Sequence, residues 1–351
     1  MRVAVLLSGG VDSSVALRLA QSETNAEITA FYLKIWLEDE LAFLGDCPWD
    51  EDLKFARAVC RQADVPLEVL SFQAEYQERI VNHALAELRQ GRTPSPDILC
   101  NQRIKFGFFF DQIGTGYHQV VSGHYAQIGT EGTRFLLKRS PDPVKDQTYF
   151  LSALTQSQLS RLWFPIGSLT KPEVRQRARQ FDLPNQARPD SQGICFLGKI
   201  KYEEFVRFHL GEKPGDILEA ETGRRLGEHQ GFWFYTIGQR KGIGLGGGPW
   251  YVVGKDVALN LVFVSHADHY RAHSRNQITL ESLHWISTEP KNMKLQTKLR
   301  HGPRLEACEI CPAENSRWRL NLKRPDPGVA PGQHAVLYTD DICLGGGVIA
   351  E

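Results

Sequence analysis

The chain has 351 residues, with 41 basic and 41 acidic side chains and a formal net charge of zero. At roughly 100 to 200 residues per domain this length suggests two or three domains, and the balanced charge excludes a uniformly basic surface for nucleic acid. The seven cysteines are an odd number, and the start "MRVAVLLSGG" lacks the features of a signal peptide. We expect a cytoplasmic protein with reduced thiols and no membrane segment, since no apolar run approaches the ~20 residues of a spanning helix.

The first half of the sequence alternates β-type and helix-type segments. Strands are expected at 3–7, 28–33, 67–72 and 120–122, and helices at 11–21, 51–63, 75–89, 157–163 and 172–180. The last of these helices carries Arg175, Arg177 and Arg179, which we interpret as a solvated face. Alternation at this spacing is typical of parallel strands connected by helices and predicts a doubly wound α/β domain over residues 1–200.

The second half is richer in glycine, aromatic residues and turn signals. Residues 201–272 are expected to form a small β-rich domain with a glycine-rich loop, and residues 273–351 a C-terminal β-barrel. The stretch "RWRLNLKR" alternates strictly, which is typical of a half-buried strand. Its apolar face holds Trp318, Leu320 and Leu322, and its basic face holds Arg317, Arg319 and Lys323.

The junction between the first strand and the first helix reads "LLSGGVDSSVAL". It leaves one serine and two glycines in the turn, where backbone N–H groups and the helix dipole face an incoming anion. An aspartate among such groups repels phosphate unless a metal ion lies between them, so Asp12 is a candidate Mg²⁺ ligand. The candidate nucleotide-binding residues are Leu6, Leu7, Ser8, Gly9, Gly10, Val11, Asp12, Ser13 and Ser14.

This turn is not a Walker A loop, because the spacing and the lysine of that motif are absent. An ordinary capped helix needs only one Ser or Asp at its start, whereas nearly every position here is Ser, Gly or Asp. "SGGVDSS" resembles the PP-loop of the N-type ATP pyrophosphatases, which have the adenine nucleotide alpha hydrolase-like fold and split ATP between its α and β phosphates. The resemblance implies ATP with Mg²⁺, and it fits argininosuccinate, asparagine and GMP synthetases equally well.

Two cysteines lie in segments punctuated by Pro or Gly, where core packing does not predict them. They are Cys100 in "GRTPSPDILCNQRIKF" and Cys195 in "PDSQGICFLG". Asp97 precedes Cys100 by three residues, a spacing that places acid and thiol on one face of a helical turn. By contrast, Cys60 in "FARAVCRQA" is interpreted as a small buried hydrophobic residue. Cys100 and Cys195 are therefore the candidate reactive thiols.

These stretches occur together with "SGHYA", "KDQTYFL", "GFWFYTIGQRKGIGLGG" and "LGGGVI". In this order, from the PP-loop to the end of the chain, they closely resemble the tRNA-specific 2-thiouridylase family. Two positions depart from the family pattern. Ser95 stands where the family's Asn-Pro-Asp has asparagine, and Leu33 stands where a methionine often lines the adenine pocket.

The resemblance implies ATP-dependent 2-thiolation of the wobble uridine of tRNA, with the tRNAs for Lys, Glu and Gln as acceptors. It implies that ATP adenylates the uridine 2-oxygen and that Cys195 carries a persulfide received from a sulfur-carrier protein or a cysteine desulfurase. Cys100 is then the nucleophile, which either releases sulfide from the persulfide or displaces the thiolated base and leaves a disulfide. Asp97 is the implied acid or base.

The same resemblance implies contacts with both substrates. Leu33 and Gly123 are added to the nucleotide site, and the uridine is expected to flip out of the anticodon loop to react. The basic outer face of the barrel is expected to meet tRNA phosphates, and we expect a monomer. The implied tRNA-contacting residues are Ser95, Pro96, Asp97, His124, Lys145, Asp146, Gln147, Arg300, His301 and Gln333.

Three alternatives stay open on sequence alone. The first is another PP-loop ligase that acts on a small metabolite, which would need neither paired cysteines nor a basic barrel. The second is a metal-binding nucleic-acid module that uses Cys308, Cys311 and Cys343, although one C-x-x-C in an alternating strand points its thiols to opposite faces. The third keeps the enzyme but holds an iron–sulfur cluster on Cys100, Cys195 and Asp97.

Overall fold

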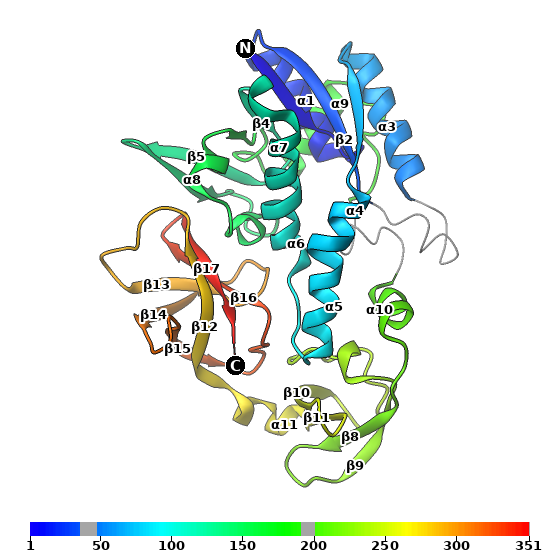
Figure 1. The fold of residues 1–351 in the computed structure, drawn as a ribbon, viewed down its shortest axis with the longest axis vertical. Helices are drawn as coiled ribbons and strands as arrows, with labels where there is room; N and C mark the ends of the chain where they lie inside the picture. Colours follow the sequence, from blue (N-terminus) through cyan, green and yellow to red (C-terminus); the bar gives the residue numbers. More distant parts are fainter. Residues whose placement is uncertain (36–47, 191–200, 351) are drawn as a thin grey trace.

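The structure, a computed structural model, describes residues 1–35, 48–190 and 201–350. An α/β domain lies at one end of the molecule, a small β module at the other, and a β-barrel packs beside both (Figure 1). The α/β domain contains a sheet built from β1 (Arg2–Leu6), β2 (Glu27–Lys34), β3 (Leu67–Ser71), β4 (Gln119–Val121) and β7 (Leu162–Trp163). Its α-helices are α1 (Val11–Glu23), α3 (Pro48–Ala63), α4 (Gln73–Tyr76), α5 (Asn82–Arg89), α6 (Pro96–Leu99), α7 (Phe109–Ile113), α8 (Gln156–Leu159) and α9 (Lys171–Gln180).

The sheet is parallel throughout, with the strand order β3-β2-β1-β4-β7. The chain runs outward from β1 through β2 to β3, and then returns to place β4 on the other side of β1. In open α/β sheets, ligands bind where the order reverses, at the carboxyl ends of the strands. The segments that follow β1 and β4 are therefore the expected place of a site.

Helices cover both faces of this sheet. Alternate residues of β1 point to opposite sides, because side chains in a strand have a period of two. Val3 and Val5 belong to a core shared with α1, α3 and α9, whereas Ala4 and Leu6 belong to a second core shared with α7 and the π-helical segment η3 (Cys100–Phe108). Both cores are buried, and β1 lies between β2 and β4 in the sheet. A parallel sheet with helices on both faces confirms the predicted doubly wound α/β class.

One predicted helix is wrong. In place of a helix over 157–163 the structure has the short α8, which ends at Leu159, and then β7, which pairs with β4. The capping box of Thr155 and Gln158 starts the helix, but Leu162 and Trp163 gain backbone partners by joining the sheet edge. A short apolar run fits helix and strand equally well, and here strand pairing decides.

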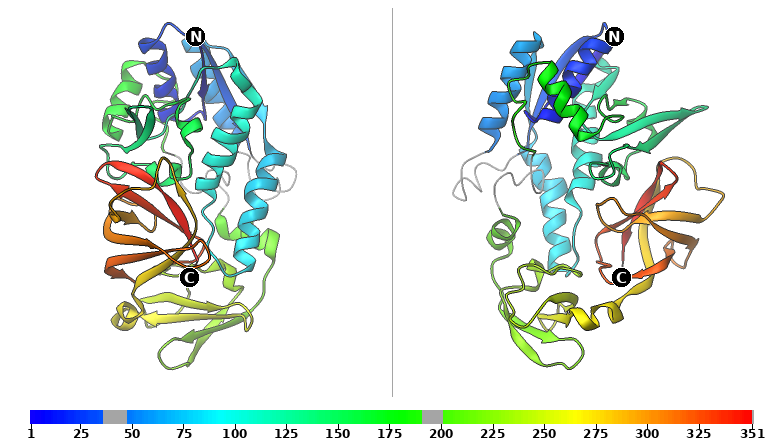
Figure 2. Two further views of the ribbon diagram at one scale, coloured as in Figure 1. Left: turned by 60° about the vertical axis from the view of Figure 1, so that its left-hand side comes forward. Right: turned by 180° about the vertical axis from the view of Figure 1, so that it is seen from behind.

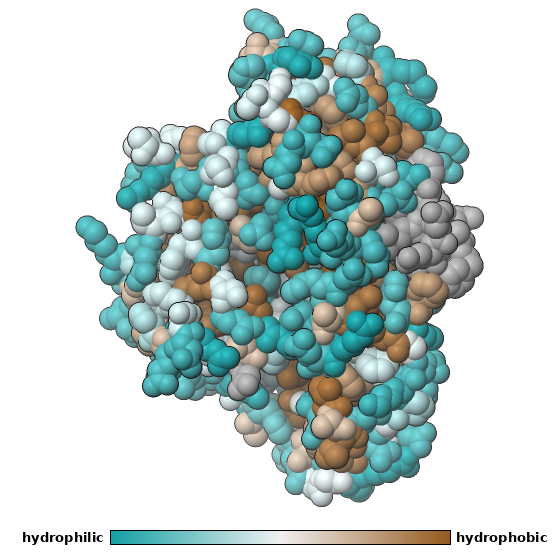
Figure 3. All heavy atoms as spheres, in the orientation of Figure 1, coloured by the Kyte–Doolittle hydropathy of each residue, from teal (hydrophilic) through white to brown (hydrophobic). Residues whose placement is uncertain are grey.

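The middle module begins with α10 (Tyr202–Leu210). Its four strands are β8 (Gly215–Glu219), β9 (Arg225–His229), β10 (Trp250–Asp256) and β11 (Leu261–His266), in the order β10-β11-β8-β9. Figure 3 shows brown, apolar atoms gathered over this lower end of the molecule. The short helix α11 (Ala267–Tyr270) leads from the module to the barrel.

The C-terminal barrel has six strands, β12 (Arg275–Trp285), β13 (Lys294–Lys298), β14 (Glu306–Pro312), β15 (Trp318–Asp326), β16 (His334–Thr339) and β17 (Ile342–Ile349). Their order is β12-β15-β14-β13-β16-β17, and pairing of β12 with β17 closes the barrel. Leu320 and Leu322 are buried in β15, whereas Arg319 and Lys323 are exposed. The predicted barrel and the alternation of this strand are confirmed.

The sequence reading missed a hairpin made of β5 (Ala126–Glu131) and β6 (Arg134–Arg139). The hairpin belongs to the first half of the chain, yet β6 pairs with β17, so it extends the sheet of the barrel. Figure 2 shows the hairpin lying above the barrel when the molecule is seen from behind. This pairing fixes the barrel against the α/β domain near the expected site.

Candidate functional site

The amino end of α1 is open toward the carboxyl end of β1. Gly10 is the N-cap residue, and no side chain caps the helix. Gly9 has a φ of +76°, and a Cβ at this position would collide with the backbone of Asp52. The turn therefore needs glycine, and it leaves backbone N–H groups and the positive end of the helix dipole free to bind an anion.

Serine hydroxyls hold the shape of this loop. Ser13 Oγ donates to the Gly10 carbonyl at 3.0 Å and lies 3.1 Å from Ser8 Oγ. Ser14 Oγ donates to the same carbonyl at 2.9 Å, and its residue is fully buried. The buried Ser14 thus holds the shape of the loop, whereas Ser8 is exposed. Phosphate binding by Ser14 stays a prediction.

Gly123, which follows β4, rests directly on this loop. A Cβ on Gly123 would lie 2.7 Å from the Ser13 nitrogen and 2.8 Å from the Asp12 carbonyl carbon. These are closer than any ordinary Cβ contact, and the atoms involved are backbone atoms that cannot turn away. The structure therefore brings Gly123 to the loop, and its contact with the nucleotide stays a prediction.

Replacing Gly123 by alanine is expected to displace the start of α1 and weaken ATP binding by at least about tenfold, with a loss of stability of about 1–3 kcal/mol from overpacking. Calorimetric titration with ATP and thermal unfolding measure the two effects. Gly246→Ala is the matched control, because a Cβ there meets nothing within 4 Å. Wild-type ATP affinity in Gly123→Ala would show that this contact does not shape the site.

Asp12 is paired with a cation that the sequence reading missed. Its Oδ1 accepts hydrogen bonds from Lys171 Nζ at 2.7 Å and from the Tyr125 hydroxyl at 3.0 Å. Lys171 Nζ also lies 2.7 Å from Asp190 Oδ1, and Asp190 is bound by Lys145 and Arg175 as well, each at 2.6 Å. The expected solvated face of α9 is thus corrected for Arg175, which belongs to this ionic cluster.

The cations also decide the charge of Asp190. Burial by itself would raise the pKa of this carboxyl, but hydrogen bonds and charges from Lys145 and Lys171 outweigh it and hold the pKa well below its usual range. Burial and the neighbouring Asp12 carboxylate raise the pKa of Tyr125, so its hydroxyl stays protonated and donates. The Asp190 carboxyl is therefore ionised at neutral pH, and the Tyr125 hydroxyl is not.

A second polar anchor holds the loop from the side of residues 185–188. Asn185 Nδ2 donates to the Gly9 carbonyl at 2.8 Å and to Ser14 Oγ at 2.9 Å, and Arg188 donates to the same carbonyl at 3.2 Å. Arg188 also pairs with Asp52. Sequence analysis missed these residues, because the polar run "NQARPD" that contains them has no periodicity to single them out.

The loop fits the polyphosphate of ATP, since it offers an uncapped helix start with Lys171 and Arg188 beside it. Mg²⁺ in nucleotide sites is held by one or two carboxylates together with substrate phosphates, and Asp12 suits that mode. Within the described ranges 1–35, 48–190 and 201–350, no group of three or more His, Cys, Asp or Glu side chains could hold a metal ion alone.

The segment before Cys100 leads into a long helical stretch. Ser95 is the N-cap residue of α6, and η3 continues this helix from Cys100. The Cys100 side chain is almost wholly buried, with 1% of the residue exposed, whereas Asp97 in the first turn of α6 is partly exposed. The Ser95 hydroxyl hydrogen-bonds the Tyr149 hydroxyl, which in turn donates to the His334 carbonyl at 3.1 Å. Cys195 lies outside the described residues.

His124 packs between two aromatic rings. Its ring centroid lies 5.7 Å from those of Phe106 and Phe164, and its Nδ1 is 2.7 Å from Ser122 Oγ. Burial, with a smaller effect of the Lys105 charge, lowers the pKa of His124 to about 3. The imidazole is neutral at physiological pH, so it can hydrogen-bond or stack but carries no positive charge.

The three residues of the expected tRNA-contacting triplet point to different partners. Lys145 binds Asp190, as above, and Gln147 Oε1 accepts from the Tyr125 nitrogen at 2.9 Å. The carboxylate of Asp146 is fully buried and paired with Lys298 Nζ at 2.8 Å. A contact between the Asp146 side chain and tRNA is therefore excluded in this arrangement, because the carboxylate lies between two domains instead of on the surface.

Among the predicted contacts on the barrel, His301 lies beside this triplet. His301 Nε2 is 3.2 Å from the Asp146 carbonyl oxygen, and its ring stacks on Phe150 with centroids 4.7 Å apart. Arg300 is half exposed and pairs with Asp326 at 2.6 Å. Gln333 is partly exposed in the turn before β16. Their contact with tRNA stays a prediction.

The metal-binding alternative receives no support from the barrel. Cys308 is buried in the barrel core, whereas Cys311 on the same strand is partly exposed, so the two thiols point to opposite faces as predicted. Cys343 packs into a different core, shared with the α/β domain. In the part of the chain that the structure describes, no helix is long and apolar enough to cross a membrane.

Comparison with known proteins agrees with this architecture. Family models named tRNA methyl transferase HUP domain, tRNA methyl transferase PRC-barrel domain and aminomethyltransferase beta-barrel domain match residues 1–199, 203–266 and 275–349. A solved NH3-dependent NAD synthetase from Campylobacter jejuni aligns with 52% of this chain and 65% of its own, with 18% identity and a TM-score of 0.31. That likeness is too distant to add support.

Curated relatives match the whole chain. The tRNA-specific 2-thiouridylase MnmA 1 of Bacteroides thetaiotaomicron is 42% identical over 358 residues, which cover 100% of both chains. The tRNA-specific 2-thiouridylase MnmA of Parabacteroides distasonis is 40% identical over 358 residues, which cover 100% of this chain and 99% of its own. Both names specify thiolation, whereas two of the family-model descriptions name methyl transfer. The full-length similarity is the more specific of the two findings.

Proposed function

The chain belongs to the tRNA-specific 2-thiouridylase family, and from this membership we propose that it replaces the 2-oxygen of the wobble uridine of tRNA by sulfur while splitting ATP. The single observation that carries the proposal is the similarity along the entire chain, from the phosphate loop to the barrel. The reaction makes it a sulfurtransferase that acts on RNA. We expect it to work in the cytoplasm, on the tRNAs for Lys, Glu and Gln.

The open start of α1 supports the use of ATP. Backbone N–H groups after β1 and the positive end of the α1 dipole suit a polyphosphate, and Lys171 and Arg188 lie beside them, each paired with a carboxylate. Mg²⁺ bound beside Asp12 would neutralise phosphate charge as the bond between the α and β phosphates breaks. Transfer of the adenylyl group to the uridine 2-oxygen then converts a poor leaving group into a good one.

The thiols of Cys195 and Cys100 would carry the sulfur chemistry. A persulfide on Cys195 is supplied by a sulfur-carrier protein or a cysteine desulfurase, and Cys100 acts as the nucleophile by one of two routes. In the first, Cys100 attacks the Cys195 sulfur and releases sulfide, which displaces AMP from C2 of the activated uridine. In the second, the outer persulfide sulfur displaces AMP from C2, and Cys100 then attacks the Cys195 sulfur of the adduct and releases 2-thiouridine. Both routes leave a disulfide between Cys100 and Cys195 for reduction. The partly exposed Asp97, in the same helical stretch as Cys100, is the proposed acid or base.

We propose that tRNA lies across the barrel and the α6 segment. Ser95, Pro96 and Asp97 would contact the flipped uridine, and the neutral His124 would stack or hydrogen-bond near it. The exposed basic face of β15, which includes Arg319 and Lys323, would meet phosphates and so fix the position of the tRNA without reading its sequence.

Mass spectrometry of nucleosides tests the proposed function. We expect 2-thiouridine, with AMP and pyrophosphate, after incubation of the protein with ATP, Mg²⁺, sulfide and unmodified tRNA that carries a wobble uridine. The matched control is the same tRNA with cytidine at the wobble position, which should stay unchanged. If no thiolated base forms while small metabolites stimulate ATP splitting, the chain is a metabolite ligase and the proposal is wrong.

A further inference from the structure

The segment from Asp142 to Thr148 lies where the phosphate loop, the α/β domain and the barrel meet. Asp142 fixes its start, because its carboxylate accepts hydrogen bonds from the backbone nitrogens of Val144, Lys145 and Lys171 at 3.0–3.1 Å. The side chains of Lys145, Asp146 and Gln147 then point to three different parts of the molecule. This short segment therefore contacts all three parts of the molecule.

Asp146 and Lys298 form the link to the barrel. Both side chains are 0% exposed, and the carboxylate also accepts from Arg139 Nε at 3.1 Å and from Thr148 Oγ1 at 2.8 Å. Burial alone would raise the pKa of the Asp146 carboxyl, but the hydrogen bond and charge of Lys298 outweigh it and hold the pKa below its usual value. A buried ion pair adds little stability over apolar residues of similar size, so its presence points to a requirement for position.

The barrel side of this link leads to the predicted tRNA contacts. Lys298 is the last residue of β13, and Arg300 and His301 follow it after one intervening residue, Leu299. His301 Nε2 is hydrogen-bonded to the Asp146 carbonyl oxygen, and its ring stacks on Phe150. The side chain of Asp146 thus binds Lys298 and its carbonyl oxygen binds His301, the two ends of one short stretch of the barrel.

The other side of the segment leads to Asp12 by two routes. In the first, Lys145 binds Asp190, which binds Lys171, which binds Asp12, with contacts of 2.6, 2.7 and 2.7 Å. In the second, Gln147 and Tyr125 exchange two hydrogen bonds at 2.9 Å, and the Tyr125 hydroxyl donates to Asp12. Both routes end on the same carboxylate oxygen at the start of α1.

We propose that the buried Asp146–Lys298 ion pair is a positioning contact that couples tRNA bound on the barrel to ATP bound at α1. The inference rests on the proposed function, since it takes tRNA and ATP as the two ligands. In this proposal the Asp146 side chain positions the barrel and does not itself contact tRNA. Coupling between two sites is reciprocal, so each ligand must change the affinity for the other by the same factor.

Equilibrium binding measures this coupling. The probes are α,β-methylene ATP, whose bridging carbon prevents splitting, and unmodified tRNA with a wobble uridine. In the wild type we expect tRNA to lower the Kd of the analogue by about 5- to 150-fold, the usual range for coupled sites. In the double variant Asp146→Asn with Lys298→Met, we expect each ligand alone to bind within about twofold of the wild type and the coupling to vanish.

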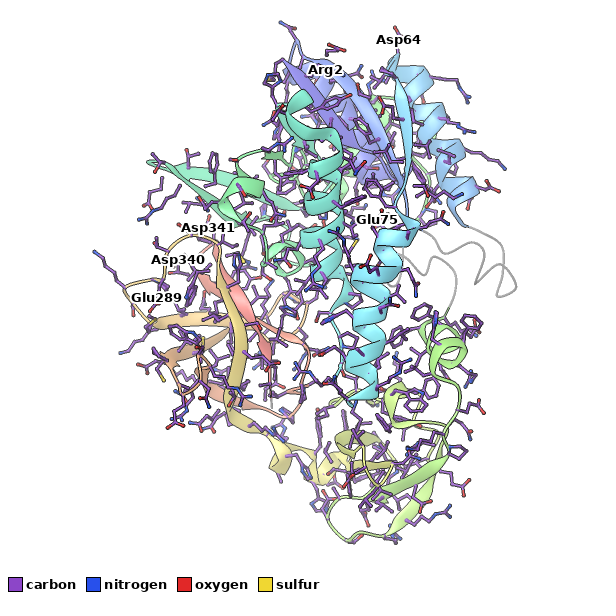
Figure 4. The ribbon with its side chains drawn as sticks, viewed as in Figure 1. Arg2, Asp64, Glu75, Glu289, Asp340 and Asp341 are labelled. Carbon is purple, nitrogen blue, oxygen red and sulfur yellow. The ribbon has the colours of Figure 1, made fainter. Side chains whose placement is uncertain are left out.

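The matched control is a second ion pair between the hairpin and the barrel. Lys138 Nζ lies 3.3 Å from Asp341 Oδ2, and the two side chains are 36% and 56% exposed. Asp341 lies at the edge of the barrel below the hairpin (Figure 4). The double variant Lys138→Met with Asp341→Asn loses a contact between the same two parts of the molecule but leaves both routes to Asp12 intact, so it should keep the wild-type coupling.

A third variant tests the inference even if the double variant of the buried pair does not fold. Tyr125→Phe keeps the ring but removes the hydroxyl that reaches Asp12, and it should reduce the coupling without changing tRNA affinity. Full coupling in the Asp146–Lys298 double variant and in Tyr125→Phe, equal loss in the control, or independent binding in the wild type would each overturn the inference. Failure of the wild type to bind tRNA or ATP at all would overturn the proposed function as well.

Discussion

Serine in place of Cys195 is expected to abolish 2-thiouridine formation and to leave ATP and tRNA binding unchanged. A serine hydroxyl cannot carry a persulfide, because the sulfur is passed on by attack of a thiolate and serine has no thiol. The loss should be complete, not partial, since no other group of the chain is placed in this role by the family pattern. Nucleoside mass spectrometry gives the product, and alkylation of the trapped persulfide followed by peptide mass spectrometry gives its position.

Cys311→Ser is the matched control for this substitution. Cys311 lies on β14 of the barrel and is partly exposed, so its thiol is accessible to the same reagents. The account predicts full thiolation in this variant. Normal 2-thiouridine levels in Cys195→Ser would falsify the assignment of the persulfide, and equal loss in both variants would point to general damage by serine.

Methionine in place of Lys171 is expected to weaken ATP binding by about 10- to 150-fold, the value of one hydrogen bond to a charged group of about 1.5–3 kcal/mol. Lys171 Nζ is shared between Asp12 and Asp190 at 2.7 Å from each. Without this cation, two carboxylates face the phosphates of ATP with less neutralising charge. Methionine keeps most of the length of the side chain, so the change reports the loss of charge.

Two further variants separate charge from helix effects. Lys171→Arg keeps the positive charge and should retain most of the ATP affinity. Arg177→Met removes an exposed cation from the same helix and should bind ATP like the wild type. Calorimetric titration with ATP in the absence of tRNA compares all four proteins, and unchanged affinity in Lys171→Met would remove Lys171 from the phosphate site.

The phosphate loop was predictable because its chemistry is local. Gly9 and Gly10 are adjacent in sequence to the strand and the helix that they connect, and both elements were visible from periodicity. The order of the sheet then placed Gly123 against the same loop. A local motif on a regular fold needs no knowledge of distant contacts.

The cations around the loop were not predictable, because they come from distant segments. Lys171 is separated from Asp12 by 159 positions and carries no periodic or motif signal of its own. It starts a helix whose Thr170 and Glu173 form a capping box, a feature that marks the helix but not its neighbour in space. Packing of α9 against α1 in a shared core brings the two together.

Asp146 shows another limit of local sequence patterns. The polar triplet "KDQ" looks like an exposed turn, and the family pattern assigns it to tRNA, yet the carboxylate is buried against Lys298 of the barrel. Nothing in the local sequence indicates that β6 joins the barrel through β17 and covers this turn. Contacts between domains depend on their packing, which short-range patterns do not contain.

Transfer of oxygen isotope tests the central claim most directly, namely that ATP activates the 2-oxygen of the wobble uridine. The substrate is tRNA that carries ¹⁸O at this position, incubated with the protein, ATP, Mg²⁺ and sulfide. The account predicts one ¹⁸O atom in the phosphate of each AMP released with 2-thiouridine. Formation of 2-thiouridine together with unlabelled AMP would contradict adenylation of the uridine and require a different route for the sulfur.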